Sequence, residues 1–183
     1  MRDAQILAAG VVERVLAGHT LDQELAALWR NNSGLSGHQR ALLQDLCYGV
    51  LRHLGTLDAL LAPLLNKPLH DERLRQLLRV ALYQLEYTRA APHAVVDHAV
   101  AACVVLRLAP AKGLVNAVLR GFLRRKDELR ATCDRSDTGR YSYPQWWIEK
   151  IRAQYLKTGT VGKIKTSRKV AKRASSVGLK KAR

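Results

Sequence analysis

A row of cationic and amide side chains on one helical segment is the strongest candidate for chemistry in this sequence. The segment 111–125 (AKGLVNAVLRGFLRR) places four polar residues four positions apart and one more arginine beside them: Lys112, Asn116, Arg120, Arg124 and Arg125. Residues four apart lie on one helix face, roughly 6 Å from each other. Cations at this spacing suit successive phosphates, because a guanidinium group can donate two parallel hydrogen bonds. The apolar face comprises Leu114, Val115, Val118, Leu119 and Phe122. The row predicts phosphate binding, with a solvated helix face as the open alternative.

Two further segments carry shorter cationic edges. The segment 38–54 (HQRALLQDLCYGVLRHL) has a second row with the same spacing: Arg40, Gln44, Tyr48 and Arg52. Tyr48 could stack on a base or pack at a helix crossing. The segment 71–88 adds the pair Arg75 and Arg79. Three helices with basic edges are typical of RNA binding, although one sequence does not reveal whether the edges converge.

The titratable residues form no pattern of a catalytic or metal site. The carboxylates are scattered, and the six histidines lack HExxH or another ligand spacing. We expect structural or exposed roles for His93 and His98. The cysteines, Cys47, Cys103 and Cys133, form no CxxC pair, which argues against zinc and against a disulfide framework. Apolar neighbours at helical spacing indicate inert buried thiols at the first two of these.

The glycine patterns predict no cofactor site. Residues 159–163 (GTVGK) resemble a phosphate-binding loop, but only two residues separate the glycines and Ile164 follows the lysine. There is also no GxGxxG-like loop after a strand, so we expect no site for a nucleotide or for S-adenosylmethionine. As the chain stands, the sequence predicts neither an enzyme nor a cofactor.

The elements that must position these residues are all helical. Apolar residues recur at three- and four-residue steps, and no alternating β-branched run is present. Gly18 sits where a C-cap glycine would end the first helix. Thr20 with Gln23, and Ser36 with Gln39, are capping-box patterns. Further helices are expected at 55–65, 71–88, 93–108 and 111–126, and a short one in QWWIEKIRAQYL. The prediction is an all-α bundle of about six to seven helices.

The charge is distributed unevenly along the 183 residues, whose formal net charge is +16. Residues 1–156 hold 21 Lys or Arg and 15 Asp or Glu, a net +6, whereas residues 157–183 hold ten cations and no acid, a net +10. Such a polar, cationic segment is expected to be disordered when free. We predict three parts: a helical RNA-binding domain (1–130), a linker with the Trp-Trp helix (131–156) and a basic tail (157–183).

Membrane and secretory classes are not expected. No apolar run approaches the roughly 20 residues that span a bilayer. Asp3 and Glu13 interrupt the first apolar stretch, which a secretory signal would not tolerate well. Together with the unpaired cysteines, this predicts a cytoplasmic protein.

Four consecutive stretches give a resemblance to a known family. HQRALLQDLCYGVLR, LRQLLRVALYQLEY, PHAVVDHAV and KGLVNAVLRGFLR, in this order, are similar to the NusB-like domain. The RYSYPQWWIEKI segment narrows the resemblance to the N-terminal domain of bacterial 16S rRNA cytosine-5 methyltransferases of the RsmB (Sun/Fmu) type. The similarity covers about residues 3–156. Antitermination factors of the NusB type share two of these stretches but ordinarily lack RYSYPQWW.

The resemblance implies a compact helical domain that binds RNA, here 16S rRNA, and positions it. In that family a following domain binds S-adenosylmethionine and carries paired catalytic cysteines. Nothing after Leu156 matches that domain. Cys133 precedes the Trp-Trp segment, and Tyr143 stands where a His often precedes the Pro. No catalytic or cofactor residue is therefore carried over. The alternative is an antitermination-type regulator with a transcription or ribosomal protein partner.

The change of composition at 156–157 has two explanations. A frameshift, a truncation or a gene fragment could have produced the acid-free tail. A selected RNA-binding arm would have the same composition. The sequence leaves both open, and also leaves open a methyltransferase supplied by another chain.

Overall fold

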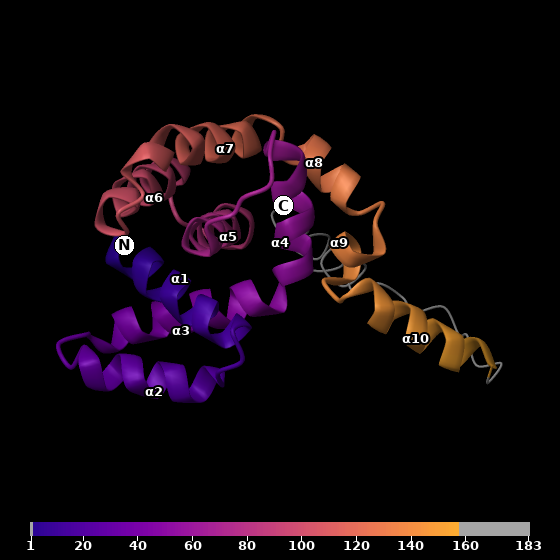
Figure 1. Ribbon diagram of the computed structural model, residues 1–183, viewed down its shortest axis with the longest axis horizontal. Coiled ribbons are helices and arrows are strands. Elements are labelled where there is room, and N and C mark those ends of the chain that lie inside the picture. The colour runs from indigo at the N-terminus through magenta and orange to yellow at the C-terminus, as the bar shows by residue number, and fades with distance from the viewer. Residues whose placement is uncertain (1, 158–183) are drawn as a thin grey trace, which may run out of the picture. The chain divides into compact units, whose positions relative to one another are not determined.

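The computed structural model describes residues 2–157, with side chains described for residues 3–155. This part of the chain contains ten α-helices and two short 3-10 helices but no strand. The all-α prediction is confirmed, and the expected number of helices, six to seven, is wrong. Figure 1 shows them in chain order: α1 (Arg2–Leu16), α2 (Leu21–Asn31), α3 (Gly37–Arg52), α4 (Leu54–Leu61), η1 (Ala62–Leu64), α5 (Glu72–Tyr87), α6 (Pro92–Val105), η2 (Ala109–Ala111), α7 (Lys112–Arg124), α8 (Lys126–Cys133), α9 (Asp137–Tyr141) and α10 (Gln145–Lys157).

Helix α5 lies at the centre of the first compact unit, which ends at Gln145. In Figure 1 it is seen almost end-on, with α1, α3, α4, α6 and α7 around it, and it contacts each of them. Every residue from Gln76 to Leu85 is buried. A helix with apolar residues on all of its faces is expected inside a domain rather than at its surface. The other helices are amphipathic and bury one face each against this central element.

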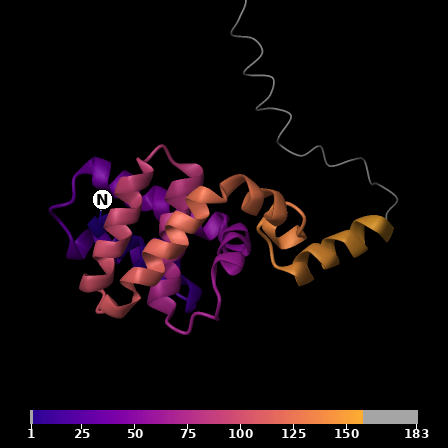
Figure 2. The same ribbon diagram turned by 90° about the horizontal axis from the view of Figure 1, so that it is seen from above.

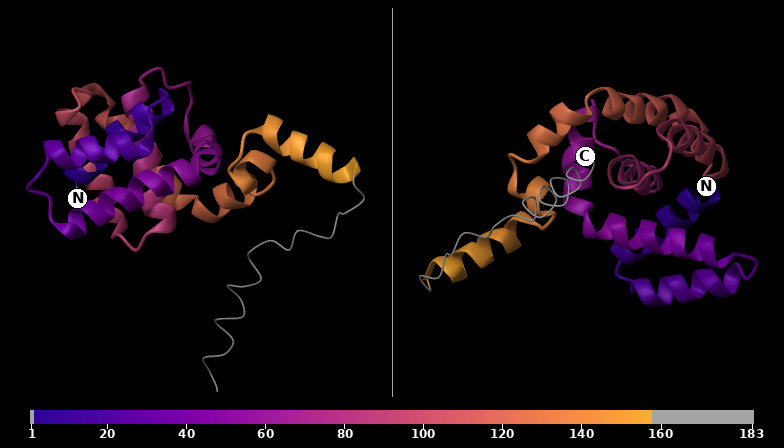
Figure 3. Two further views of the ribbon diagram at one scale, coloured as in Figure 1. Left: turned by 90° about the horizontal axis from the view of Figure 1, so that it is seen from below. Right: turned by 180° about the vertical axis from the view of Figure 1, so that it is seen from behind.

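The helices around α5 form two sides of the bundle. Helices α6 and α7 pack against each other and run side by side across the molecule in Figure 2. Helix α3 packs against α1 and α5 on the other side, as the view from behind in Figure 3 also shows. The aliphatic core between these layers includes the fully buried Phe122, the single phenylalanine of the chain.

Local signals explain several helix ends. Gly18 adopts a φ of +109°, and its N–H donates to the Val15 carbonyl at 3.0 Å, as expected of a C-cap glycine. The capping box at Ser36 and Gln39 is confirmed, since both reciprocal hydrogen bonds are present. The one predicted at Thr20 is wrong, because α2 begins there without a side-chain cap. Two acids in its first turn suit the positive end of that helix instead.

The main difference from the expected elements lies between residues 126 and 141. The sequence predicts no helix between residue 126 and the Trp-Trp helix, and a linker from residue 131, yet this stretch forms α8 and α9. Ser136 caps α9 by accepting a hydrogen bond from the Gly139 N–H at 3.1 Å. Both helices pack on α4 (Figure 1). They hold only eight and five residues, too few to display a helical period.

Two predicted helices are shorter than expected. The segment 55–65 is helical only to Leu61 and then tightens into η1, which contains Pro63. The segment 111–126 breaks at Arg125. The Trp-Trp helix is confirmed as α10, which lies in the second compact unit from Trp146 onward. The predicted basic tail lies outside the described residues except for Lys157. The domain boundary at residue 130 stays a prediction.

In the described part of the chain, no helix has both the length and the apolar character needed to cross a bilayer.

Gly49 on α3 tests the packing of α3 against α5. A Cβ at this position would lie 2.0 Å from Cζ of the buried Tyr83 ring. We expect Gly49→Ala to lower the free energy of unfolding by about 1–3 kcal/mol, measured by urea denaturation, because the helices must separate to admit the methyl group. Gly113→Ala is the control: its Cβ meets nothing within 4 Å. It should raise that free energy by up to about 1 kcal/mol. Equal effects of the two changes would contradict the close approach.

Candidate nucleic-acid interface

The predicted row on α7 lies on the solvent side of that helix. Lys112, Arg120 and Arg124 are exposed, and Asn116 is half-buried. Nε of Arg120 donates to Oδ1 of Asn116 at 2.8 Å, which holds the guanidinium along the helix axis. We call these four residues the α7 row. The opposite face is buried at Val115, Val118, Leu119 and Phe122. Leu114, assigned to that face from the sequence, is instead 39% exposed.

No carboxylate in the described residues forms an ion pair with Lys112, Arg120 or Arg124. Arg125, beside the row, differs. Its Nη2 and Nε donate to the two oxygens of Glu128 at 2.9 and 3.0 Å. This hydrogen-bonded pair raises the pKa of Arg125 and lowers the pKa of Glu128. Both groups are exposed, so solvent weakens the pair. The α7 row is therefore an uncompensated line of positive charge with one compensated arginine at its end.

The predicted row on α3 is more mixed. The Arg40 guanidinium lies 5.8 Å from the Trp29 ring centroid, and the side chain is half-buried. Tyr48 is 42% exposed, and its hydroxyl donates to Oδ1 of Asp22 at 3.4 Å. Gln44 and Arg52 are exposed. We call Arg40, Gln44, Tyr48 and Arg52 the α3 row. Figures 1 and 3 place α3 and α7 on opposite sides of α5, so the two rows do not converge.

The third predicted pair, on α5, requires a correction. The Arg79 side chain is only 8% exposed, and its Nε and Nη2 each donate to an Asp58 oxygen at 2.7 Å. A third hydrogen bond runs to Oε1 of Gln76 at 2.9 Å. Arg79 is thus a structural residue that joins α5 to α4, and it presents no group to a phosphate. Burial on all sides of α5 is the cause.

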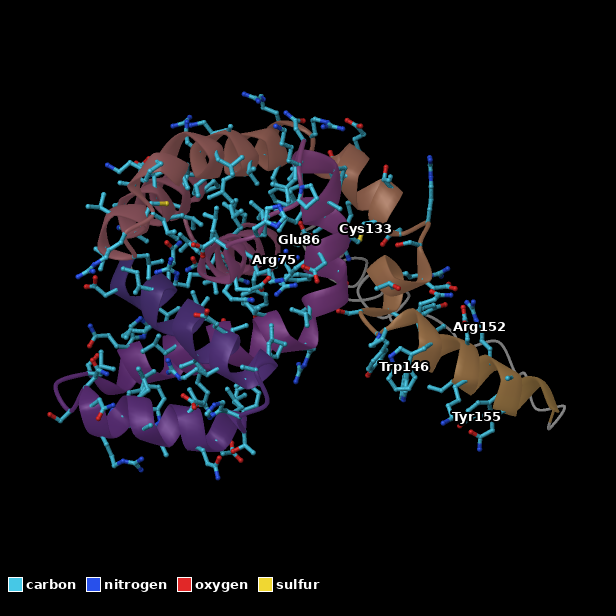
Figure 4. The ribbon with its side chains drawn as sticks, in the orientation of Figure 1. Arg75, Glu86, Cys133, Trp146, Arg152 and Tyr155 are labelled. Carbon is cyan, nitrogen blue, oxygen red and sulfur yellow. The ribbon has the colours of Figure 1, made fainter. Side chains whose placement is uncertain are left out.

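Arg75, labelled in Figure 4, also makes contacts within its own part of the fold. Its Nη2 donates to the Leu69 carbonyl, and its Nε lies 3.2 Å from an oxygen of Glu72. The side chain is one-third exposed. These contacts tie the start of α5 to the loop before it. Arg75 is therefore a weaker candidate for RNA than the α7 row.

Comparisons with known proteins identify the family of this chain. The family model described as the NusB family matches residues 2–124. The chain belongs to the NusB family. It is also similar to Ribosomal RNA small subunit methyltransferase B of Escherichia coli O7:K1 (strain IAI39 / ExPEC), at 39% identity over 157 residues. The proteins of the same description from Escherichia coli O1:K1 / APEC and Escherichia fergusonii are 38% identical over 157 residues.

These alignments cover 84% of this chain and 36% of each relative, so the chain spans about a third of the length of the curated relatives it matches. The resemblance inferred from the sequence is confirmed for both the NusB family and the methyltransferase relatives.

A cation-rich corner of this NusB-family fold was missed by sequence reasoning. Glu86, near the end of α5, is 11% exposed and accepts contacts from Arg130 Nη1 at 3.0 Å and Lys126 Nζ at 3.3 Å (Figure 4). Arg130 also lies 3.7 Å from Asp134 and donates to the Tyr87 hydroxyl at 3.1 Å. The partners come from α5 and α8, and Arg130 lies 44 positions after Glu86 in the sequence. Spacing along one helix, the signal used for the rows, does not reveal such a cluster.

His53 occupies the junction of α3 and α4 in the same corner. Its ring stacks on Tyr87 with centroids 4.1 Å apart and an interplanar angle of 18°. Burial lowers the pKa of His53, the positive charges of Arg52 and Arg130 lower it further, and Glu86 partly opposes them. These effects favour the neutral imidazole, which offers an aromatic surface to Tyr87.

The three cysteines of the chain are all buried and free. Burial raises the pKa of Cys47 to about 12, and it also raises the pKa values of Cys103 and Cys133. A neutral thiol is a poor nucleophile. The predicted burial of Cys47 and Cys103 is confirmed.

The structural role of Arg79 gives a stability prediction. Arg79→Ala should lower the free energy of unfolding by about 2–3 kcal/mol, because it removes three hydrogen bonds and leaves the Asp58 carboxylate and Oε1 of Gln76 without their donor. Urea denaturation measures the change. Arg73→Ala, which breaks an exposed pair with Asp71, is the matched control and should have a much smaller effect. A small effect at both positions would show that the α4–α5 link is dispensable.

The lowered pKa of His53 predicts a pH dependence of stability. The unfolded chain binds a proton at His53 more readily than the folded chain does, so the folded state loses stability as pH falls below the unfolded pKa of about 6.5. His53→Phe keeps a stacking ring without a titrating group. Between pH 7.5 and 5, the free energy of unfolding should therefore fall less in this variant than in the wild type. Parallel curves from urea denaturation at several pH values would contradict the assignment.

Proposed function

We propose that this NusB-family chain binds small-subunit ribosomal RNA through the α7 row and positions it, without carrying out methyl transfer itself. One observation carries the proposal: Lys112, Arg120 and Arg124 form an exposed line on one helix, and no described carboxylate pairs with them. Cations at this spacing fit the phosphates of an RNA backbone, which supply most of the affinity in such complexes. Arg125, Arg40 and Arg52 are secondary contacts.

The choice of RNA follows from the relatives. Their description is ribosomal RNA small subunit methyltransferase, and the similarity extends over 157 residues. The NusB-family match ends at residue 124. Because the longer similarity is to the methyltransferases, a role beside rRNA modification is favoured over an antitermination role. The RNA partner proposed is therefore 16S rRNA.

The non-catalytic part of the proposal rests on the cysteines. The methyltransferase family resembled by this sequence uses catalytic cysteines, whereas the three cysteines here are buried with raised pKa values. Such thiols do not attack a cytosine ring. The contribution of this chain is binding and orientation of RNA, and S-adenosylmethionine has no role in it.

Charge reversal on the α7 row tests the RNA site. We expect Arg120→Glu combined with Arg124→Glu to weaken binding to a 16S rRNA fragment at least tenfold at moderate salt. The slope of log Kd against log salt concentration should also fall by about 1.5–2, since two phosphate contacts are lost. Fluorescence anisotropy at four or five salt concentrations measures both quantities.

The matched control reverses two exposed arginines that are not on α7, Arg30→Glu with Arg89→Glu. It makes the same change in net charge and should weaken binding far less. Equal losses in the two double variants would mean that net charge, and not the α7 row, drives binding. If the wild-type chain binds no RNA, the proposed function is wrong.

A further inference from the structure

A small pocket beside the start of α4 has the composition of a nucleotide site. Its cavity volume is about 220 Å³, and all of its lining residues belong to the first compact unit. The polar and aromatic groups that matter are Arg52, His53, Tyr87, Arg130, Arg140 and Tyr141. They come from four separate parts of the fold: the α3–α4 junction, α5, α8 and α9. We call this the arginine–tyrosine pocket.

The three arginines of the pocket are not equivalent. Arg130 is occupied by Glu86, Tyr87 and Asp134. Arg52 and Arg140 are exposed, and neither forms an ion pair with any carboxylate in the described part of the chain. Arg52 is also the last member of the α3 row. Two uncompensated guanidinium groups at one concave site can bind a phosphate with parallel hydrogen bonds.

The aromatic surfaces of the pocket are held in place by its framework. Tyr87 is fixed by its stack on His53 and by the hydrogen bond from Arg130. Tyr141 is 38% exposed, and the Arg140 guanidinium lies 5.4 Å from its ring centroid. An exposed phenol ring beside cations is the surface on which proteins stack an unpaired base.

The backbone next to Tyr141 is unusual. Ser142 adopts a φ of +60°, a left-handed conformation that a residue other than glycine rarely takes. Its Oγ accepts from the Thr56 N–H at 3.3 Å, and its own N–H donates to the Thr138 carbonyl at 2.9 Å. These bonds to α4 and α9 hold the strained turn that positions Tyr141 and Tyr143 at the rim of the pocket. Strain of this kind gathers at binding sites.

We propose that the arginine–tyrosine pocket binds one unstacked nucleotide of single-stranded RNA. Arg52 and Arg140 contact its phosphate, and its base stacks on Tyr141. The volume admits a single base or phosphate and is too small for a folded protein element. This inference rests on the proposed function, because it assumes that the chain binds RNA. It adds a second contact, specific for single strands, whose residues are not members of the α7 row.

The test compares a labelled single-stranded 12-nucleotide RNA with the same sequence in a fully paired duplex, using the full chain. Tyr141→Ala should weaken single-strand binding by roughly 5- to 100-fold, the usual loss when one stacked base loses its aromatic partner. The slope of log Kd against log salt concentration should stay unchanged, and the Kd for the duplex should not change. Tyr141→Phe should bind as the wild type does, since the ring is kept.

Arg52→Gln combined with Arg140→Gln should lower the single-strand salt slope by about 1.4, the value for two phosphate contacts on a single strand. The control is Arg135→Gln with Arg89→Gln, two exposed arginines that do not line the pocket. Circular dichroism checks that each variant is folded.

Two results with these variants would overturn the pocket. One is single-strand binding by Tyr141→Ala within twofold of the wild type. The other is an equal salt slope for the Arg52→Gln/Arg140→Gln variant and for its Arg135→Gln/Arg89→Gln control. If the reversal at Arg120 and Arg124 still weakens binding to the 16S fragment, the proposed function survives that failure. Displacement of the RNA by an acidic peptide of equal charge, with no sensitivity to Tyr141→Ala, would also contradict a nucleotide site.

Discussion

The burial of α5 on all sides is the constraint from which the rest of this structure follows. A central helix must satisfy every polar side chain that it carries, since an unpaired polar group away from water is costly. Gln84 accepts from Nε2 of Gln5 on α1 at 2.7 Å, and Arg79 is bonded to Asp58 on α4. These contacts set the positions of α1 and α4 around α5. Each surrounding helix then turns its apolar face inward and leaves its polar face to solvent.

The same constraint decides which cations remain available. Several carboxylates of the first unit are paired with particular cations: Glu24 with Arg14, Glu72 with Arg75, Asp58 with Arg79, Glu86 with Arg130 and Glu128 with Arg125. This pairing is local and leaves several exposed cations without an ion pair among the described residues, and two groups of them matter for the proposed binding. One is the α7 row, and the other is formed by Arg52 and Arg140 in the arginine–tyrosine pocket. The net charge of residues 1–156 is only +6. Because the acids lie beside particular cations, the positive charge is stronger at the α7 row and at Arg52 and Arg140 than this net value indicates.

Much of the fold could be predicted from the sequence because its signals are periodic or local. The apolar period located α3, α5, α6 and α7, and Ser36 with Gln39 marked a helix start correctly. Thr20 with Gln23 failed because the same residue types can stand at a helix start without bonding to it. Helices α8 and α9 were missed because a helix of one or two turns shows no period. Their stability comes from packing on α4, which a sequence does not display.

The candidate site was predictable to the extent that it lies on one helix. The α7 row follows from a spacing of four on a helix with one buried face, and the structure keeps its residues together. Arg79 has the same spacing from Arg75, and only the burial of α5 distinguishes it from a surface cation. The arginine–tyrosine pocket joins residues 52 and 140, and no periodicity relates them. A row on one helix can contact the repeating phosphates of a nucleic-acid backbone, whereas a pocket of nucleotide size is built from several elements. The arginine–tyrosine pocket, the site proposed to be specific for single strands, could therefore be found only in the structure.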